Sequence, residues 1–318
     1  MHSFSHFCVL KACVFRGRRS LVGTEQMVIL GAPPRYGLIG GSGVQVQGDN
    51  RWMVETPFGP CLLASLDDER RIIFANRHLC TKINAEGKAE YAPPHEVNYR
   101  ALVWALVVSS QCKSVVSLSS TGTLHPEDIP VGSMLSAEDY YMVTPQAMTF
   151  WGHEKIGAFE APEEGVGRIH YSPADPASRA DWVKRIQGIL QSVLSEKVKD
   201  KVKFTKGQTS SSWPLVEGEE MVYVNTVGPR FETRAEIRSY RGIGHVVGMT
   251  AGNEWMLCEE LQVPYFLLCC CDNACNGLSK HPKGALQEYL ENKQVVADVT
   301  AAVVYGLVEG LTKGGYAA

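Results

Sequence analysis

The sequence lacks long apolar runs, a marked excess of either charge, and the cysteine density of a disulfide scaffold. No apolar run approaches the roughly 20 residues that span a bilayer as a helix, so nothing indicates a membrane protein. The formal net charge of −3, with Lys and Arg scattered over most of the chain, provides no broad attraction to nucleic acid or to an acidic membrane. Because 45% of the 318 residues are apolar, the chain can bury a substantial core. We expect a globular protein with a small-molecule partner.

Ten cysteines are present, and three of them, Cys269 to Cys271, are consecutive within the apolar run YFLLCCC. This pattern is typical of reduced thiols in a buried strand rather than of crosslinks. A zinc site built from Cys271 and Cys275 would need two further ligands, and no CxxC pair supplies them. We therefore expect no bound metal ion.

The first 26 residues differ in composition from the rest of the chain. They contain Lys11 and three arginines but no acidic residue before Glu25. A basic, acid-poor segment with serines resembles a mitochondrial presequence. The same composition fits a disordered extension, or residues that precede a true start at Met27. We favour a disordered extension over residues 1–26 and a cytoplasmic protein.

Short apolar runs rich in Val, Ile and Phe alternate with helical patterns along the rest of the chain. The predicted strands are 36–40, 71–76, 114–120, 221–226, 245–250 and 265–271. The predicted helices begin at Ser178, where Ser178 and Asp181 form a capping-box-like start, and cover 253–261 and 285–311. This order predicts one α/β domain over residues 27–318, with a mixed central β-sheet and helices on both faces.

A glycine-rich turn follows the first predicted strand. In Gly40-Gly41-Ser42-Gly43, backbone amides can approach a ligand closely, and one hydroxyl remains. A dinucleotide fingerprint would need a third spaced glycine where Val46 stands, so that interpretation is weak. A turn without a function is the alternative.

Other polar residues also lie where predicted strands end. Arg77 and His78 follow one strand, and Ser119 to Thr121 end another. Ligands of open α/β sheets bind beyond the carboxyl ends of the strands, so these donors can converge. Arginine and hydroxyl groups suit a tetrahedral oxyanion such as orthophosphate. Each residue alone has an ordinary explanation as a surface ion pair, a core histidine or a turn serine.

Six motifs of the sequence resemble, in their order along the chain, those of the purine nucleoside phosphorylase and methylthioadenosine phosphorylase family. They are GLIGGSG, NRH, VNYRALVWAL, SLSSTGTLHPEDIPVG, VGPRFETRAEI, and VVGMT followed by Glu254. The resemblance runs from about Tyr36 to the C-terminus. It implies the phosphorylase/hydrolase-like fold, a homotrimer, orthophosphate as a co-substrate, and no metal or organic cofactor. The residues it assigns to phosphate are Ser42, Arg77, His78, Ser119, Ser120 and Thr250. It places Met249 against the ribose and Phe231 against the purine.

The resemblance implies a mixed pattern of residues around the base. Asp272 is matched to the family's Asp or Asn beside N7 and the 6-substituent, and a carboxyl group there favours adenine. Glu232 is instead typical of members that bind 6-oxopurines. Ala274 replaces a second Asp of the adenine-specific members. His170 matches a residue that reaches the 5′ group of the substrate, with a surface-loop histidine as the alternative.

These matches predict a pentosyltransferase with a purine nucleoside and phosphate as its small-molecule partners. The leading expectation is phosphorolysis of 5′-deoxy-5′-methylthioadenosine, with Asp272, Ser42, Arg77 and His78 as the catalytic residues. The alternatives are a phosphorylase that prefers 6-oxopurine nucleosides, methylthioinosine included, and a nucleoside-binding protein without activity. The phosphate-binding residues argue against the last, since binding a nucleoside alone needs no anion site.

Overall fold

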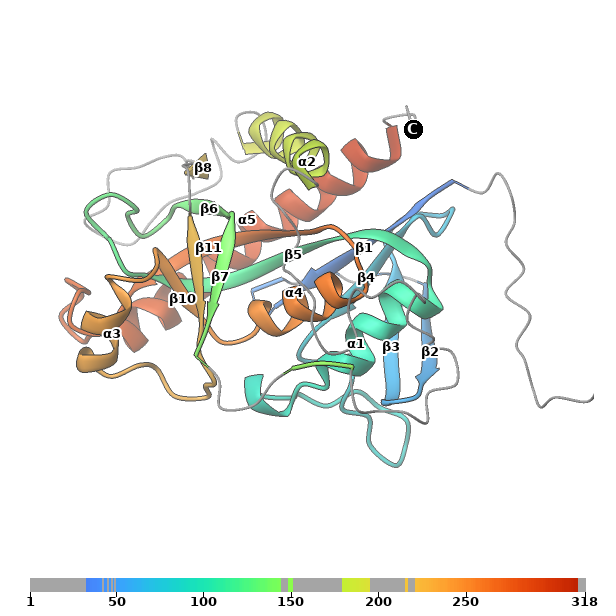
Figure 1. The fold of residues 1–318 in the computed structure, drawn as a ribbon, viewed down its shortest axis with the longest axis horizontal. Coiled ribbons are helices and arrows are strands. Elements are labelled where there is room, and N and C mark those ends of the chain that lie inside the picture. Colours follow the sequence, from blue (N-terminus) through green and yellow to red (C-terminus); the bar gives the residue numbers. More distant parts are fainter. Residues whose placement is uncertain are drawn as a thin grey trace, which may run out of the picture. The chain divides into compact units, whose positions relative to one another are not determined.

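A computed structural model of the chain contains a mixed β-sheet with helices on both of its faces (Figure 1). The structure describes residues 33–41, 43–44, 46, 48, 50–143, 148–150, 179–194, 215–216 and 221–313. The predicted basic extension over residues 1–26 lies outside this part of the chain. The predicted α/β class with a mixed central sheet is confirmed.

Eleven strands form the sheet within the described residues. They are β1 (Arg35–Gly40), β2 (Asn50–Thr56), β3 (Gly59–Ser65), β4 (Ile72–Asn76), β5 (Cys112–Thr123), β6 (Met134–Ala137), β7 (Asp139–Met142), β8 (Leu215–Val216), β9 (Val222–Asn225), β10 (Val246–Gly248) and β11 (Tyr265–Ala274). Their main order is β2-β3-β4-β1-β5-β10-β9-β7, with β11 paired to β5 and β6, and β6 paired to β8. The six predicted strands correspond to β1, β4, β5, β9, β10 and β11. The β2–β3 hairpin and the short strands β6 to β8 were not predicted.

Strand β5 changes its neighbours along its length. Its residues from Cys112 to Leu118 pair in parallel with β1, whereas Gly122 and Thr123 pair antiparallel with β10. Strand β11 accompanies β5 on its other side and runs parallel to it. Residues 119–121 therefore lie between the carboxyl end of β1 and the carboxyl end of β10, which approaches from the opposite direction. A gap between neighbouring strands at their carboxyl ends is where α/β sheets bind ligands.

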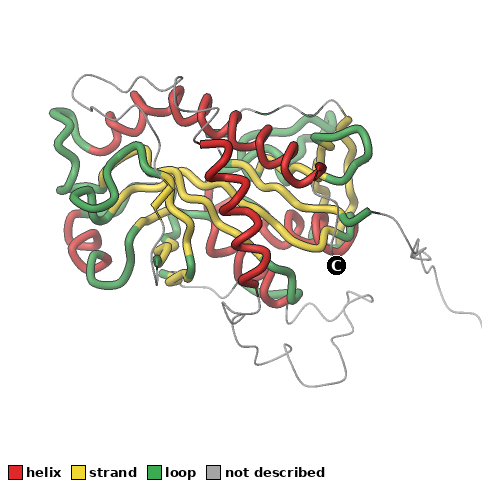
Figure 2. The backbone as a smooth tube through the Cα atoms, turned by 90° about the horizontal axis from the view of Figure 1, so that it is seen from above, coloured by secondary structure: helices red, strands yellow, loops and turns green. Residues whose placement is uncertain are grey.

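Five α-helices accompany the sheet in the described residues: α1 (Tyr99–Trp104), α2 (Ala180–Val193), α3 (Arg234–Tyr240), α4 (Ala251–Glu260) and α5 (Ala285–Lys313). A π-helical turn, Ala105–Ser109, extends α1, and a 3-10 turn covers Pro94–Glu96. Helices α2 and α5 lie together on one side of the sheet, and α1 and α4 pack against each other on the opposite side (Figures 1 and 2). The three predicted helices correspond to α2, α4 and α5. Helix α2 has Arg179 as its N-cap, and Ser178 lies outside the described residues.

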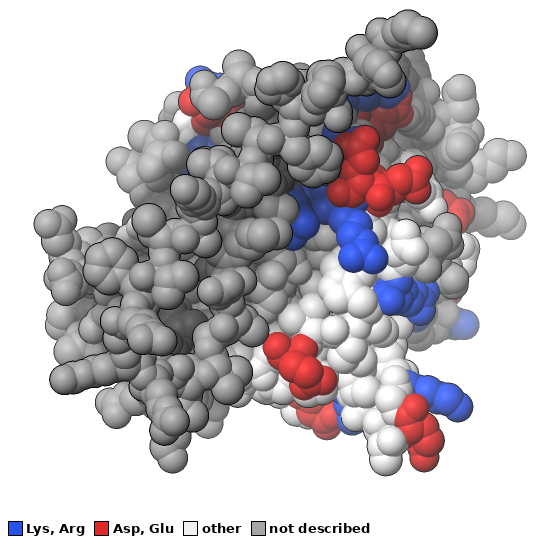
Figure 3. Space-filling view, turned by 90° about the vertical axis from the view of Figure 1, so that its right-hand side faces the viewer, with Lys and Arg blue, Asp and Glu red and all other residues white. Residues whose placement is uncertain are grey.

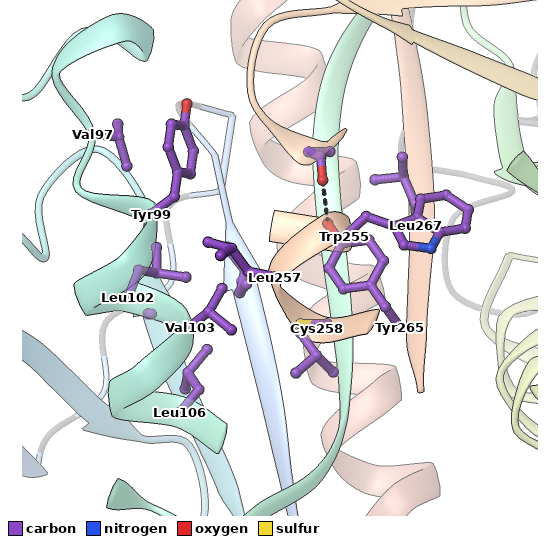
Figure 4. Close-up of a cluster of buried hydrophobic side chains, with 14 of the residues drawn as sticks. Val97, Tyr99, Leu102, Val103, Leu106, Trp255, Leu257, Cys258, Tyr265 and Leu267 are labelled. Atoms are coloured by element: carbon purple, nitrogen blue, oxygen red, sulfur yellow. Dashed lines mark hydrogen bonds between the residues drawn. The ribbon is translucent and has the colours of Figure 1, made fainter. Parts of the chain in front are cut away.

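Strand β11 is buried on both faces, which explains its continuous apolar sequence. Leu267, Cys269 and Cys271 belong to the core that contains α1 and α4. Figure 4 shows Leu267 in this core, near Trp255 and Tyr265. Phe266, Leu268 and Cys270 alternate with them and belong to the core under α2 and α5. The prediction that the cysteines are buried strand residues is confirmed, since all three are free and buried.

Helix α5 is long and apolar enough to cross a membrane by length and composition, but half of its most apolar stretch is buried within the protein. Val296, Val299, Val303 and Leu307 recur at intervals of three to four residues and are all buried. They join the core formed with α2 and the sheet. The apolar composition of α5 is thus explained by packing on the sheet.

Exposed charged side chains form local pairs. Lys82 and Glu96 are 2.8 Å apart, as are Arg230 and Glu236. On the face in Figure 3, described acidic and basic side chains are interspersed. Exposed pairs of this kind contribute at most about 1 kcal/mol each to stability. The one fully buried ion pair among the described residues lies elsewhere, beside the gap in the sheet.

Candidate active site

A cavity of about 400 Å³ opens where β5 changes its neighbours. This volume lies within the range of small-molecule sites. The residues predicted from the sequence that line it are Arg77, His78, Ser119, Ser120, Phe231, Glu232, Met249 and Thr250. They come from four segments that are distant in the sequence and meet at the carboxyl ends of the strands. Ser42 and His170 lie outside the described residues, so their roles stay predictions.

One end of the cavity gathers groups that donate hydrogen bonds, and we call it the anion site. It comprises Gly41, Arg77, His78, Ser119, Ser120 and Thr250. Gly41 follows β1, Arg77 and His78 follow β4, and the two serines lie on β5 where it has left β1. The parallel register of β1 with β4 and β5 thus brings three strand ends together.

Arg77 is held in a buried network beside this site. Its Nε and Nη2 atoms donate to Glu254 over 2.5 and 2.9 Å, Nη2 also donates to Ser117 Oγ, and Nη1 donates to the Leu118 carbonyl. Glu254 is completely buried, and it also accepts from the Tyr265 hydroxyl over 2.8 Å. Burial alone would lower the pKa of the Arg77 guanidinium, but Glu254 more than offsets this and raises it. Arg77 is therefore a fixed cation, and its charge is compensated.

The guanidinium keeps one N–H for a ligand. The guanidinium has five N–H groups, and the four hydrogen bonds above occupy four of them. The remaining N–H is on Nη1. Nη1 lies directly against Gly41, because a Cβ atom at position 41 would come within 2.6 Å of it. Glycine is required here so that the loop after β1 and the guanidinium can share the same small space.

His78 has a defined orientation. Its Nδ1 atom lies 2.8 Å from the Ala92 carbonyl, and its ring stacks on Tyr91 with centroids 5.1 Å apart. The loop after His78 folds back so that Ala92 N donates to the His78 carbonyl. Burial, followed by the neighbouring Arg77 charge, lowers the pKa of His78 to about 4. The imidazole is therefore neutral at physiological pH.

Thr250 is the N-cap of α4, and its buried side chain borders the cavity. Helix N-termini favour anions. Here, however, the first amides are already used: those of Thr250 and Ala251 donate to the Tyr223 hydroxyl, and that of Gly252 donates to Asn225. The helix therefore offers an anion the Thr250 hydroxyl rather than free backbone donors.

At the other end of the cavity, the structure differs from the expectation for Asp272. Asn273 lines the cavity, and neither Asp272 nor Ala274 does. The reason is a β-bulge: Cys271 pairs with Thr121 and Asn273 with Gly122, so Asp272 has no partner residue on β5. A bulge shifts the alternation of side chains by one residue. The side chain presented at the strand end is consequently an amide rather than a carboxyl group.

Asp272 is enclosed behind the anion site. Its Oδ2 atom forms a short hydrogen bond with the Ser120 hydroxyl, while Oδ1 is buried with no hydrogen-bond partner. Burial raises the pKa of Asp272 to about 8, against the opposing effect of the Ser120 hydrogen bond. Asp272 is thus largely protonated near neutral pH and supports Ser120 from behind.

The end of the cavity that Asn273 lines also contains Glu232 and two aromatic rings, and we call it the base end because the sequence predicts that it faces the purine. One oxygen of the mostly buried Glu232 accepts from Thr226 Oγ1 over 2.6 Å, which leaves the other available. Burial raises the pKa of Glu232. Phe231 meets Tyr289 edge to face at 5.9 Å, and both rings line the cavity.

Several residues of the site were not found from the sequence. Asn273, Cys275, Asn276, Tyr91, Leu286 and Tyr289 line the cavity, and Glu254 and Ser117 hold Arg77. Asn273 is adjacent to the residue that was chosen, but a bulge has no signature in a single sequence. Tyr91 lies in the loop between two motifs and Tyr289 lies far from any motif, and both reach the cavity only through the fold.

Known proteins that are similar to this chain are nucleoside phosphorylases. The model of the Phosphorylase superfamily matches residues 35–309. A probable S-methyl-5′-thioinosine phosphorylase of Methanocaldococcus jannaschii is 31% identical over 77% of this chain and 81% of its own length. A 6-oxopurine nucleoside phosphorylase of Pyrococcus furiosus is 28% identical over 77% and 82%. Methylthioadenosine phosphorylase of Schistosoma mansoni, at 22% identity, superimposes with a TM-score of 0.63 over 89% of this chain and 93% of that structure, which shows the shared fold.

The chain belongs to the phosphorylase superfamily, as its sequence motifs predicted. It is a nucleoside phosphorylase, a pentosyltransferase of the group that contains the methylthioadenosine and purine nucleoside phosphorylases.

Proposed function

We propose that this enzyme cleaves 6-oxopurine nucleosides with orthophosphate, and that 5′-deoxy-5′-methylthioinosine and inosine are the substrates to compare first. The observation that carries the proposal is Asn273 at the cavity in place of Asp272. The names of the relatives from M. jannaschii and P. furiosus point in the same direction. The expectation of a methylthioadenosine phosphorylase depended on Asp272 facing the base.

The hydrogen-bonding polarity of the base end matches a 6-oxopurine. Hypoxanthine presents an acceptor at O6 and a donor at N1–H, while adenine presents the reverse. The Asn273 amide donates to the Ala274 carbonyl over 3.0 Å, and it keeps one N–H for O6 and its oxygen for a protonated N7. The free oxygen of Glu232 can accept N1–H. A buried mismatch of one such partner costs about 1–3 kcal/mol.

Catalysis then depends on positioning and charge. Phosphate in the anion site attacks the anomeric carbon of the ribose as the bond to the purine breaks, so negative charge develops on the base. The Asn273 amide and Glu232 hold the leaving purine, and Met249 borders the ribose position. Phe231 and Tyr289 enclose the purine rings. These fixed groups stabilise charge that develops in the transition state without reorganising.

The test compares phosphate-dependent kcat/KM for inosine, methylthioinosine, adenosine and methylthioadenosine. Wild type should prefer the 6-oxo member of each pair. Asn273→Asp should lower the ratio of 6-oxo to 6-amino efficiency by about tenfold to a hundredfold, because the carboxylate accepts from a 6-amino group. The adjacent Asp272→Asn is the matched control and should change this ratio less than about threefold, because its side chain does not reach the base.

A wild type that prefers methylthioadenosine, together with a ratio that responds to Asp272→Asn and not to Asn273→Asp, would contradict the proposal. Base release that continues at the same rate without phosphate would contradict phosphorolysis altogether. The homotrimer, the role of His170 at the 5′ group and a cytoplasmic location stay predictions.

A further inference from the structure

We propose that a second cavity, separate from the active site, binds a small anion that carries a chain of two or more phosphoryl groups. This cavity has a volume of about 760 Å³ and lies between α3 and the loop that precedes α5. We call it the basic cavity, after Arg234 and Arg238 of α3 and Lys283 of the loop, which line it. It shares only Asn276 with the cavity of the active site, so it includes no residue of the anion site.

The basic cavity gathers positive charge from two elements. Its lining contains Arg234, Arg238 and Lys283, and none of the described residues that line it is acidic. Arg234 and Arg238 are four residues apart in α3, so they lie on the same face of the helix. A cavity lined by charge of one sign attracts the opposite charge and raises its local concentration. The occupant that fits this lining is therefore an anion.

The four arginines in and beside α3 differ in their partners. Arg230 and Arg241 lie outside the lining of the basic cavity, and each forms an ion pair. Glu236, the one acidic residue of α3, accepts from Arg230 with both of its oxygens. Arg234 and Arg238 have no hydrogen-bond or ion-pair partner among the described residues. The two guanidinium groups that line the cavity are thus the two whose charge is not compensated.

The loop before α5 forms the opposite wall and holds one arginine in place. Gly277 has a φ of +88°, and a Cβ atom there would lie 3.2 Å from Cγ of Arg234. The aliphatic part of Arg234 therefore packs directly on the loop backbone, where only glycine leaves it room. Further along the loop, His281 Nδ1 accepts from the Lys283 amide, and Nε2 lies 3.2 Å from Glu291. Glu291 also lowers the net charge around Lys283, so the two arginines carry most of the uncompensated charge.

Helix α5 begins at the basic cavity and adds a backbone donor. Its first residue, Ala285, is part of the lining. The first amides of a helix have no acceptor within the helix, and the helix dipole favours an anion beside them. In α5, the first amide with an acceptor among the described residues is that of Glu288, which donates to the Gly284 carbonyl. The Ala285 amide thus supports the two arginines in binding an anion.

The chemistry and the size of the lining identify the class of anion. Guanidinium groups bind phosphate oxygens through paired N–H donors. Arg234 and Arg238 are separated by one helical turn, about 5–6 Å between their Cβ atoms, so they can bind neighbouring groups of one chain. A single small anion would contact only part of a lining that extends over two elements. Because no Phe, Tyr or Trp lines the cavity, it has no ring on which a base could stack, and the phosphoryl groups are what it recognises.

The experiment is a calorimetric titration of the full-length enzyme with inorganic tripolyphosphate, near neutral pH and with orthophosphate present to occupy the anion site. Wild type should bind about one tripolyphosphate per chain, and the affinity should fall as the ionic strength rises. Sulfate should compete only at a concentration about tenfold higher or more, because it presents a single group. ATP should bind within about threefold of tripolyphosphate, and a preference for ATP of more than about tenfold would overturn recognition of the phosphoryl chain alone.

Variants of the arginines locate the site. Arg238→Gln should weaken tripolyphosphate about threefold, and Arg234→Gln combined with Arg238→Gln about tenfold, since solvent screens exposed charges. Arg241→Gln removes the same charge from the end of α3 outside the lining and is the matched control, with an expected change of less than about twofold. The double variant should keep its kcat and its KM for phosphate within about twofold, because neither residue lines the active site.

Three results would overturn the proposal. The first is an affinity for tripolyphosphate that is the same in wild type and in the double variant, which would place the ligand elsewhere. The second is an equal loss in Arg241→Gln, which would mean that only the net charge matters. The third is no binding by wild type at all. Binding is measured without turnover, so each result is independent of the proposed function.

Discussion

The two ends of the cavity are built in different ways. At the anion site, side chains are fixed by partners from other elements: Arg77 by Glu254 of α4 and by β5, and His78 by the Ala92 carbonyl. At the base end, Asn273 bonds mainly to its own neighbour, and its placement depends on one bulged residue in β11. The geometry of the anion site is thus set by its residue types and by a hydrogen-bond network between elements. Base selectivity is instead set by the local register of strand β11. The predictions below test this difference, from the largest expected effect to the smallest.

Arg77→Ala should abolish phosphorolysis and also destabilise the protein. Removing one member of a buried ion pair costs about 3–5 kcal/mol, because Glu254 would remain buried and uncompensated. Arg77→Met combined with Glu254→Gln removes both charges and should recover much of the stability but none of the activity. Thermal unfolding and kcat/KM of the three proteins separate the two effects. Full activity in the double variant would show that Arg77 is structural only.

Asp272 and His78 should give the stability of the protein opposite dependences on pH. The pKa of Asp272 is raised from 3.8 to about 8 by burial. Between these values the unfolded chain releases this proton and the folded chain keeps it, so the free energy of unfolding falls as the pH rises from about 4 to about 8. Asp272→Asn should flatten this decline by up to a few kcal/mol, at about 1.4 kcal/mol for each pKa unit. Urea unfolding at several pH values measures it, and an unchanged slope would exclude Asp272 as the cause.

For His78 the dependence of stability on pH has the opposite sign. Its pKa is lowered from 6.5 to about 4. The unfolded chain takes up this proton first, so stability falls as the pH drops from about 6.5 to about 4. His78→Asn should remove part of this acid-side decline and leave the decline between pH 7 and 8 unchanged. The same unfolding series in the two single variants would therefore assign each part of the pH dependence to one of these two residues.

Glu232→Gln should affect the base end alone. The amide can still face N1–H through its oxygen, but it loses the charge, and it competes with Thr226 for orientation. We expect a loss of about tenfold to a hundredfold in kcat/KM for 6-oxo substrates and little change in the affinity for phosphate. Calorimetric titration of phosphate, beside kinetics with inosine, checks both. An equal loss for both ligands would mean that the two ends are coupled.

Thr233→Ala is expected to have the smallest effect. Thr233 caps α3 in a capping box with Glu236, immediately after Phe231 and Glu232. Losing the cap should cost about 1 kcal/mol in stability. Because Glu232 is held separately by Thr226, the selectivity ratio should stay within about twofold. A larger change in the ratio would show that α3 helps to position the base end.

Much of the fold could be predicted because its signals are local. The runs at β1, β4, β5, β9, β10 and β11 carry enough Val, Ile and Phe to predict strands, and the 3.6-residue spacing predicts α2, α4 and α5. Strand β2 was missed because half-buried residues alternate with exposed ones there, and α1 because six residues are too few for a helical period. For the site, placement at strand ends was enough to find Arg77, His78 and the serines 119 and 120, whereas Thr250 was found through the family resemblance.

What the sequence determined by itself was the α/β class, the family through its ordered motifs, and the residue types that gather at the strand ends. What only the tertiary structure decided was orientation: which residue of the pair Asp272 and Asn273 faces the cavity, which carboxylate compensates Arg77, and which nitrogen of His78 is free. The physical reason is the separation along the chain of the residues that produce each feature. Strand and helix signals arise from neighbours in the chain, whereas a bulge, a buried ion pair and a histidine tautomer are set by contacts between residues far apart in it.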